Sequence, residues 1–184
     1  MALAEDIWAV PYVLTPADCR AQIELSDAAG YEAAPLGDNF SGPNGFHISR
    51  DGRNCGRAVV DDAETAAQLW AGLTQHLPAE WRGRRALGLN ERLRFYRYTA
   101  GERLGLHRDG YYRRPDGAQS LWTLMIYLNQ DFTGGATRFA REEIIVTPQT
   151  GLALVFPHHF WHEGCPVIDG CKYVIRSDIM FAPG

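Results

Sequence analysis

The chain has 184 residues, of which 46% are hydrophobic and 22% charged. This length predicts one packed domain over residues 1–184, and this composition excludes a disordered or fibrous protein. Its formal net charge of −4 and its lack of a basic cluster argue against nucleic acid as an obligatory partner. No apolar run is long enough to cross a bilayer and the N-terminus lacks the pattern of a secretory signal, so we expect a cytoplasmic protein without a membrane partner.

The N-terminal part, residues 1–90, is predicted to be mixed, with two helices. The first should span residues 15–30, because a threonine N-cap is followed by proline at the first helical position and a glycine ends the pattern. Residues 38–58 are rich in Gly, Asn and Ser and should form turns and short strands. The second helix should begin at a cap at Asp61 or Asp62 and end near Pro78. Its apolar face is predicted to consist of Ala66, Leu69, Trp70 and Leu73.

From residue 91 onward the pattern changes to short strands. The runs typical of strands are residues 93–98, 120–129, 131–140, 142–148, 150–157 and 171–181. No helical pattern separates them, which argues against a parallel sheet with crossover helices. The sequence therefore predicts a mainly β fold with flanking helices: a double-stranded β-helix, or jelly roll, over residues 91–181, buttressed by the N-terminal helices.

Four cysteines, Cys19, Cys55, Cys165 and Cys171, are scattered along the chain without a C-x-x-C pair. In a chain of this size without a secretory signal, we expect them to be reduced thiols rather than a disulfide framework. An alternative is a zinc site formed by Cys165 and Cys171 with His162, although the usual spacing of zinc ligands is missing.

The stretch GLHRDG, residues 105–110, contains the three letters HRD that open the catalytic loop of protein kinases. A kinase needs an asparagine five residues after that aspartate, and Arg114 occupies the position here. The other kinase motifs are missing, and the chain is too short for two lobes. The kinase interpretation is therefore rejected.

A metal site is the second interpretation of the same stretch. On a strand, His107 and Asp109 would point to the same side and could share a metal. Non-haem Fe(II) oxygenases use two histidines and one carboxylate, and they leave the other coordination positions open. The second histidine would come from a distant strand. The candidates are His158, His159 and His162, of which His162 is favoured.

A cation near the open positions of such a metal would suit a cosubstrate with two carboxylates. Lys172 follows His162 by ten residues on the next predicted strand, and Arg176 lies on the same face of that strand. The combination of H-x-D, a distant histidine and this lysine on a series of short strands is far more specific than H-x-D alone.

From RFYRYTAGERLGLHRDG to KYVIRSDIMF, residues 91–181, the chain resembles the Fe(II)- and 2-oxoglutarate-dependent dioxygenases, and among them the prolyl 4-hydroxylase-like branch. The resemblance implies hydroxylation of an unactivated C–H bond, coupled to decarboxylation of 2-oxoglutarate to succinate and CO2. The implied cofactors are Fe(II), 2-oxoglutarate and O2, with ascorbate as an optional supporting reductant.

The resemblance also implies roles for the matched residues. His107, Asp109 and His162 would bind Fe(II), and Lys172 would pair with the distal carboxylate of 2-oxoglutarate. The remaining cofactor-binding candidates are Tyr127, which would hydrogen-bond that carboxylate, Tyr98, which would line the pocket, and Arg176. For Arg176 two roles stay open: anchoring 2-oxoglutarate or substrate, and an ion pair with Asp178.

The substrate is not encoded in these motifs. Two polar loops, residues 38–58 and 109–120, are placed to decide it. Arg57, Tyr111 and Arg113 could meet an anionic substrate or a peptide backbone there, or could belong to solvated loops. A prolyl or other amino-acid unit is the favoured substrate. The alternatives are a small metabolite, an oxidation other than stable hydroxylation, and a jelly-roll module that binds a metal or ligand without catalysis.

Overall fold

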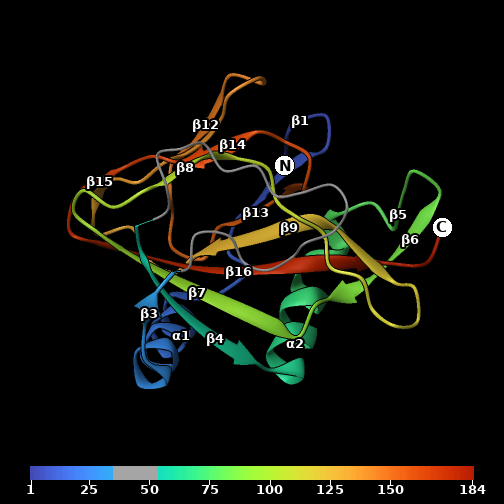
Figure 1. Cartoon of the computed structure of the whole chain (residues 1–184), viewed down its shortest axis with the longest axis horizontal. Helices are drawn as coiled ribbons and strands as arrows, with labels where there is room; N and C mark the ends of the chain where they lie inside the picture. Colours follow the sequence, from blue (N-terminus) through green and yellow to red (C-terminus); the bar gives the residue numbers. More distant parts are fainter. Residues whose placement is uncertain (35–53) are drawn as a thin grey trace.

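Two facing antiparallel sheets form most of the computed structural model, which describes residues 1–34 and 54–184 (Figure 1). In spatial order, the main path of the large ten-stranded sheet is β1 (Ala2–Ala4), β2 (Ile7–Val10), β13 (Ala153–Pro157), β9 (Gln119–Tyr127), β16 (Cys171–Phe181), β7 (Arg92–Thr99), β4 (Gly56–Asp61) and β3 (Glu32–Ala33). Its other two strands are β6 (Arg84–Leu89), which pairs with β16, and β5 (Glu80–Trp81), which pairs with β6.

The small sheet lies over one end of the large one. Its four strands are, in spatial order, β12 (Ile144–Val146), β11 (Thr137–Phe139), β14 (His162–Gly164) and β8 (Leu104–His107). A two-stranded ribbon of β10 (Thr133–Gly134) and β15 (Val167–Asp169) lies at the edge. The mainly β fold with flanking helices and a jelly-roll core is confirmed.

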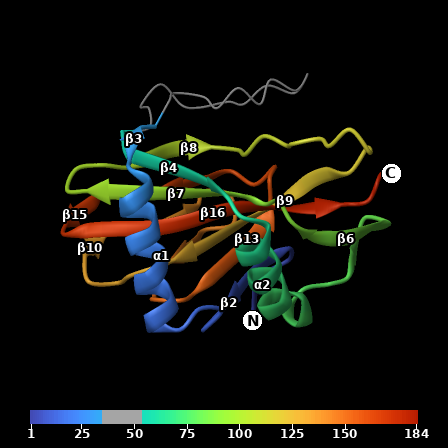
Figure 2. The ribbon, with the colours of Figure 1, turned by 90° about the horizontal axis from the view of Figure 1, so that it is seen from below.

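Both helices lie on the face of the large sheet that points away from the small sheet (Figures 1 and 2). Helix α1 (Pro16–Ala29) begins at the N-cap Thr15 with a capping box and ends at Gly30, as predicted. Helix α2 (Ala63–Leu73) begins at the cap Asp62. It ends five residues before Pro78, because the chain tightens into the 3-10 turn η1 (Thr74–His76).

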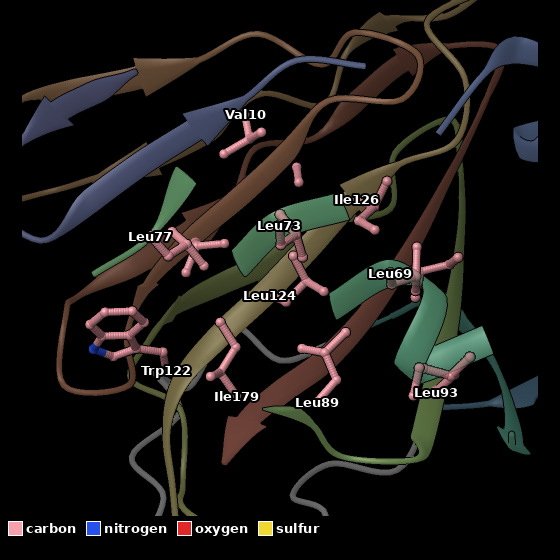
Figure 3. Close-up of a cluster of buried hydrophobic side chains, with 14 of the residues drawn as sticks. Val10, Leu69, Leu73, Leu77, Leu89, Leu93, Trp122, Leu124, Ile126 and Ile179 are labelled. Atoms are coloured by element: carbon pink, nitrogen blue, oxygen red, sulfur yellow. The ribbon is translucent and has the colours of Figure 1, made fainter. Parts of the chain in front are cut away.

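Side chains along β9 alternate between two buried layers. Trp122, Leu124 and Ile126 face the helices and belong to one hydrophobic cluster with Leu69 and Leu73 of α2 (Figure 3). The intervening side chains face the small sheet, and these are Thr123, Met125 and Tyr127. Burial on both faces explains why this segment has a continuous apolar run rather than strict alternation.

Several strands of the large sheet were not predicted. Strand β2 pairs with β13, β4 pairs with β7, and β6 pairs with the end of β16. These N-terminal segments are short, and the partners that stabilise them are distant in the sequence. Of the predicted loop 38–58, residues 35–53 lie outside the described part of the chain, and the end of the loop enters β4.

Candidate metal centre and its pocket

A pocket lies between the inner face of the large sheet and the small sheet. Both sheets contribute to its lining, which consists of Tyr96, Tyr98, Leu104, His107, Asp109, Met125, Thr137, His162, Gly164, Lys172, Val174 and Arg176. The pocket therefore contains the three predicted metal ligands, the predicted lysine and arginine, and one of the two predicted tyrosines.

Three of these residues form a group able to hold a metal ion. One nitrogen or oxygen from each of His107, Asp109 and His162 lies within 4.8 Å of the others. His107 ends β8 and His162 begins β14, and the two residues are direct partners in the ladder of these strands. The Nε2 atom of His107 lies 3.6 Å from Asp109 Oδ1, and Nε2 of His162 lies 3.7 Å from Oδ2.

Asp109 reaches this group from outside the strand. Strand β8 ends at His107, so strand alternation does not position the carboxylate as the sequence suggested. Instead, the backbone N–H of Asp109 donates to the carbonyl of His158 at 3.0 Å. This bond holds the chain beside the end of β13 and places the carboxylate between the two imidazoles.

The hydrogen bonds of the two imidazoles determine which nitrogen faces the group. Nδ1 of His107 lies 2.8 Å from the carbonyl oxygen of Gly105, and Nδ1 of His162 lies 3.1 Å from that of Phe160. A carbonyl can only accept, so each Nδ1 carries the proton of the neutral ring and each Nε2 presents a lone pair. Burial and, to a smaller extent, the nearby His107 lower the pKa of His162 to about 3. The lowered pKa favours this neutral form.

Two imidazole lone pairs therefore converge on a buried carboxylate with no proton between them. Such an arrangement is favourable when a cation lies at its centre, and two imidazoles with one carboxylate match the facial ligand set of non-haem Fe(II). The residues present thus fit the metal that the sequence suggested.

The carboxylate of Asp109 is held on both oxygens. Nη2 of Arg176 lies 3.0 Å from Oδ1, and the hydroxyl of Thr123 donates to Oδ2 at 2.5 Å. Burial raises the pKa of Asp109, but the guanidinium of Arg176 outweighs it and holds the pKa well below its ordinary value. Arg176 also lies 3.3 Å from Asp178, which is the ion pair considered from the sequence, whereas its contact with Asp109 was not predicted.

Lys172 occupies the other part of the pocket on β16. It is 2% exposed, and its ammonium donates to the carbonyl of Gly135 at 2.6 Å. The Nζ atom lies 5.4 Å from the ring centre of Tyr98 and 5.3 Å from that of Tyr127. Burial lowers the pKa of Lys172 to about 8. Lysine occurs nowhere else in the sequence.

The two tyrosines differ in position. Tyr98 lies on β7, rather than in the turn after it, and lines the pocket. Tyr127 lies behind the lining, with its hydroxyl 2.7 Å from that of Thr137. Thr137 lines the pocket itself, so Tyr127 is connected to the pocket through that hydroxyl.

His158 and His159 do not belong to the metal group. His159 is exposed and stacks on Trp81. His158 is 6% exposed and lies behind Asp109, with Nδ1 2.8 Å from the hydroxyl of Thr123. Burial lowers its pKa to about 4. His158 lies in the turn after β13, and neither it nor Thr123 was predicted to support the metal ligands.

The three residues proposed to contact substrate are all described. Arg57 is half-buried on β4, Tyr111 is half-buried, and Arg113 is exposed, with a backbone bridge to Gln119. None of these three described side chains lines the pocket around the metal group.

The cysteines lie apart from the metal group found in the described residues. Cys19 and Cys55 are buried, Cys165 and Cys171 are half-buried, and all four are free thiols. The zinc interpretation is not supported, because His162 joins His107 and Asp109 rather than the two neighbouring cysteines.

Comparison with known proteins adds a family and a fold. The model of the 2OG-Fe(II) oxygenase superfamily matches residues 93–177, which include every residue of the metal group. No curated protein matches the chain.

No helix in the described residues has the length and hydropathy needed to span a membrane.

Three solved structures share the fold along most of their length. The viral collagen prolyl hydroxylase of Paramecium Bursaria Chlorella virus-1, solved with 2OG, is 18% identical with a TM-score of 0.65, over 95% of this chain and 96% of that one. A Pseudomonas putida prolyl-4-hydroxylase is 16% identical with a TM-score of 0.62, over 95% and 91%. A Trichoplax adhaerens prolyl hydroxylase, in complex with a hypoxia inducible factor peptide, is 15% identical with a TM-score of 0.67, over 95% and 83%. Residues 93–177, which contain the metal group, therefore match the 2OG-Fe(II) oxygenase superfamily, and the chain as a whole has the fold of the prolyl hydroxylases; together these findings support a 2-oxoglutarate-dependent non-haem iron dioxygenase.

Proposed function

We propose that this enzyme hydroxylates a prolyl or other amino-acid unit, with Fe(II) bound by His107, Asp109 and His162. The observation that carries the assignment of the metal is the convergence of two Nε2 lone pairs on the Asp109 carboxylate. Bound Fe(II) supplies the activation of dioxygen, and 2-oxoglutarate supplies two electrons as it loses CO2. One oxygen atom enters the substrate as a hydroxyl group and the other enters succinate.

The charges of the pocket suit an anionic cosubstrate. Two neutral imidazoles and one carboxylate give a divalent metal site a net charge of about +1. The ammonium of Lys172 has three donors, of which Gly135 accepts one, so donors remain for the distal carboxylate of 2-oxoglutarate. Tyr98 lines the space beside it. Arg176 is already paired with two carboxylates, so we assign it to the orientation of Asp109 rather than to cosubstrate binding.

The walls of the pocket support an aliphatic amino-acid unit as substrate. Tyr96, Leu104, Met125 and Val174 present mainly apolar surface near the metal group. Proteins of the same fold include a collagen prolyl hydroxylase and an enzyme bound to a peptide. On this proposal Arg57, Tyr111 and Arg113 contact the parts of the substrate that extend beyond the pocket. The single domain and the cytoplasmic location stay predictions.

Succinate release is the experiment that tests the substrate class. The Fe(II)-loaded enzyme is supplied with 2-oxoglutarate and, in parallel, with proline-containing peptides, free amino acids including L-proline, or small metabolites without an amino-acid unit. We expect stoichiometric succinate and a product one oxygen atom heavier with members of the first two groups. Turnover confined to the third group would contradict the proposal and favour the metabolite alternative.

The affinity for 2-oxoglutarate should depend on the charge of Lys172. The protonated ammonium is the form that binds, and burial has moved its pKa from the ordinary value of 10.5 to about 8. Affinity should therefore be constant below about pH 7 and should fall above pH 8, approaching tenfold per pH unit. Titration of the Mn(II)-loaded protein with 2-oxoglutarate between pH 7 and pH 9 measures this dependence.

The variant Lys172→Met is the control for that titration, because its side chain cannot titrate. Its weaker affinity should show no inflection near pH 8, and metal affinity measured at the same pH values corrects for changes at the ligands. An inflection of equal size in both proteins would assign the pH dependence to another group.

A further inference from the structure

A continuous chain of hydrogen bonds leads from the backbone after the metal ligands to the carboxylate of Asp109. The backbone N–H of Tyr112 donates to Ser120 Oγ at 2.7 Å, and that hydroxyl lies 3.0 Å from Nε2 of His158. On the other side of the ring, Nδ1 lies 2.8 Å from the hydroxyl of Thr123, which lies 2.5 Å from Asp109 Oδ2. All three intervening side chains are buried.

With a neutral His158 ring, the direction of each proton in this chain follows from the donors and acceptors at its ends. A carboxylate only accepts, so the single proton of Thr123 points to Asp109 and its oxygen must accept from Nδ1–H of His158. In the neutral ring Nε2 then carries a lone pair, which accepts the proton of Ser120. The oxygen of Ser120 in turn accepts from the backbone N–H of Tyr112. Burial lowers the pKa of His158 to about 4, which favours the neutral ring, and with that ring each of the three side chains donates once and accepts once.

Asp109 needs such support because it lies beyond the end of β8. Ladder hydrogen bonds hold His107 and His162, but the carboxylate ligand stands on irregular backbone. His158 supports it twice, through its own carbonyl, which accepts the N–H of Asp109, and through the ring, which acts on Oδ2 by way of Thr123. Arg176 holds the other oxygen, so the plane of the carboxylate is set from both sides.

We propose that His158 and Thr123 are positioning residues that orient the Asp109 carboxylate toward the metal and couple it to the loop beginning at Tyr112. The proposal rests on the proposed function, since it requires a metal bound by Asp109. Movement of this loop when substrate binds would act on the ligand through Ser120 and His158.

Two substitutions interrupt the chain at different points. Thr123→Val removes the hydroxyl with little change of shape, and His158→Phe removes both ring nitrogens. Co(II) serves as the probe, because its visible absorption bands report the ligand geometry and its titration gives an affinity. We expect Thr123→Val to weaken Co(II) binding by about ten- to a hundredfold and His158→Phe to weaken it by about tenfold, both with shifted bands. Because His158 acts through Thr123, the double variant should lose little more than Thr123→Val alone.

Conservative variants separate positioning from folding. Thr123→Ser retains the donor to Asp109, and His158→Asn places an amide N–H where Nδ1 stood, so both should bind Co(II) within about threefold of the wild type. Ser177→Ala is the matched control. It removes a buried hydroxyl that bonds to the backbone of Asn90, away from the pocket, and should lower the melting temperature without shifting the bands.

The outcomes distinguish the two proposals. Wild-type affinity and unchanged bands in Thr123→Val and His158→Phe would overturn the positioning role while leaving the metal site intact. Equal losses in Thr123→Ser and Thr123→Val would also overturn it. Failure of the wild-type protein to bind Co(II) would contradict the metal assignment itself, and the positioning role with it.

Discussion

Replacing His162 by alanine should abolish metal binding and turnover, whereas replacing His159 by alanine should leave both unchanged. His162 is buried in the metal group and its Nε2 faces the carboxylate of Asp109. His159, three residues earlier, is exposed and stacks on Trp81. The two variants therefore remove the same side chain from nearly the same place in the sequence but from opposite environments.

His162→Ala should lose more metal affinity than a substitution of any residue that only contacts a metal ligand. Removing an outer partner of a metal ligand costs about ten- to a hundredfold in affinity, so removing a ligand itself should cost more than about a hundredfold. Anaerobic Fe(II) titration measures the affinity, and succinate release measures turnover. Fe(II) binding within tenfold of the wild type in His162→Ala would contradict the ligand assignment.

Replacing Lys172 by methionine should weaken 2-oxoglutarate binding strongly and leave Fe(II) binding intact. Truncating one partner of a buried charge pair costs about 2–5 kcal/mol, which corresponds to roughly thirtyfold to a few thousandfold in affinity. Methionine has a similar length and no charge. Because it also removes the penalty of burying an ammonium, the variant should be about as stable as the wild type.

This combination separates a binding role from a structural one. The titration is made with 2-oxoglutarate on Fe(II)-loaded protein without oxygen, and thermal unfolding is followed on the same samples. Unchanged affinity for 2-oxoglutarate in a folded Lys172→Met protein would remove this lysine from the cosubstrate site. Arg176 would then be the remaining cation of the pocket.

The parts of the fold that could be predicted depend on local signals. The threonine cap and proline at the start of α1 act within one helical turn, and the apolar run of β9 identifies a buried strand. The predicted ligands converge because His107 and His162 lie on β8 and β14, and these two strands pair in an antiparallel way.

The features that could not be predicted depend on register between distant strands. Thr123 lies opposite Phe156 of β13 and Asp178 of β16, and these pairings bring its hydroxyl to His158 and Asp109. A shift of one residue would turn Thr123 to the face of the helices. The contact between Arg176 and Asp109 has the same origin, because nothing near either residue in the sequence indicates the other.

The single lysine of this chain makes its pocket chemically addressable. A reagent selective for amines has one side-chain target in this sequence, Lys172, and the lowered pKa of its ammonium increases the unprotonated, reactive fraction at neutral pH. Reductive methylation with an isotopic label would therefore give one side-chain signal, located where 2-oxoglutarate is expected to bind.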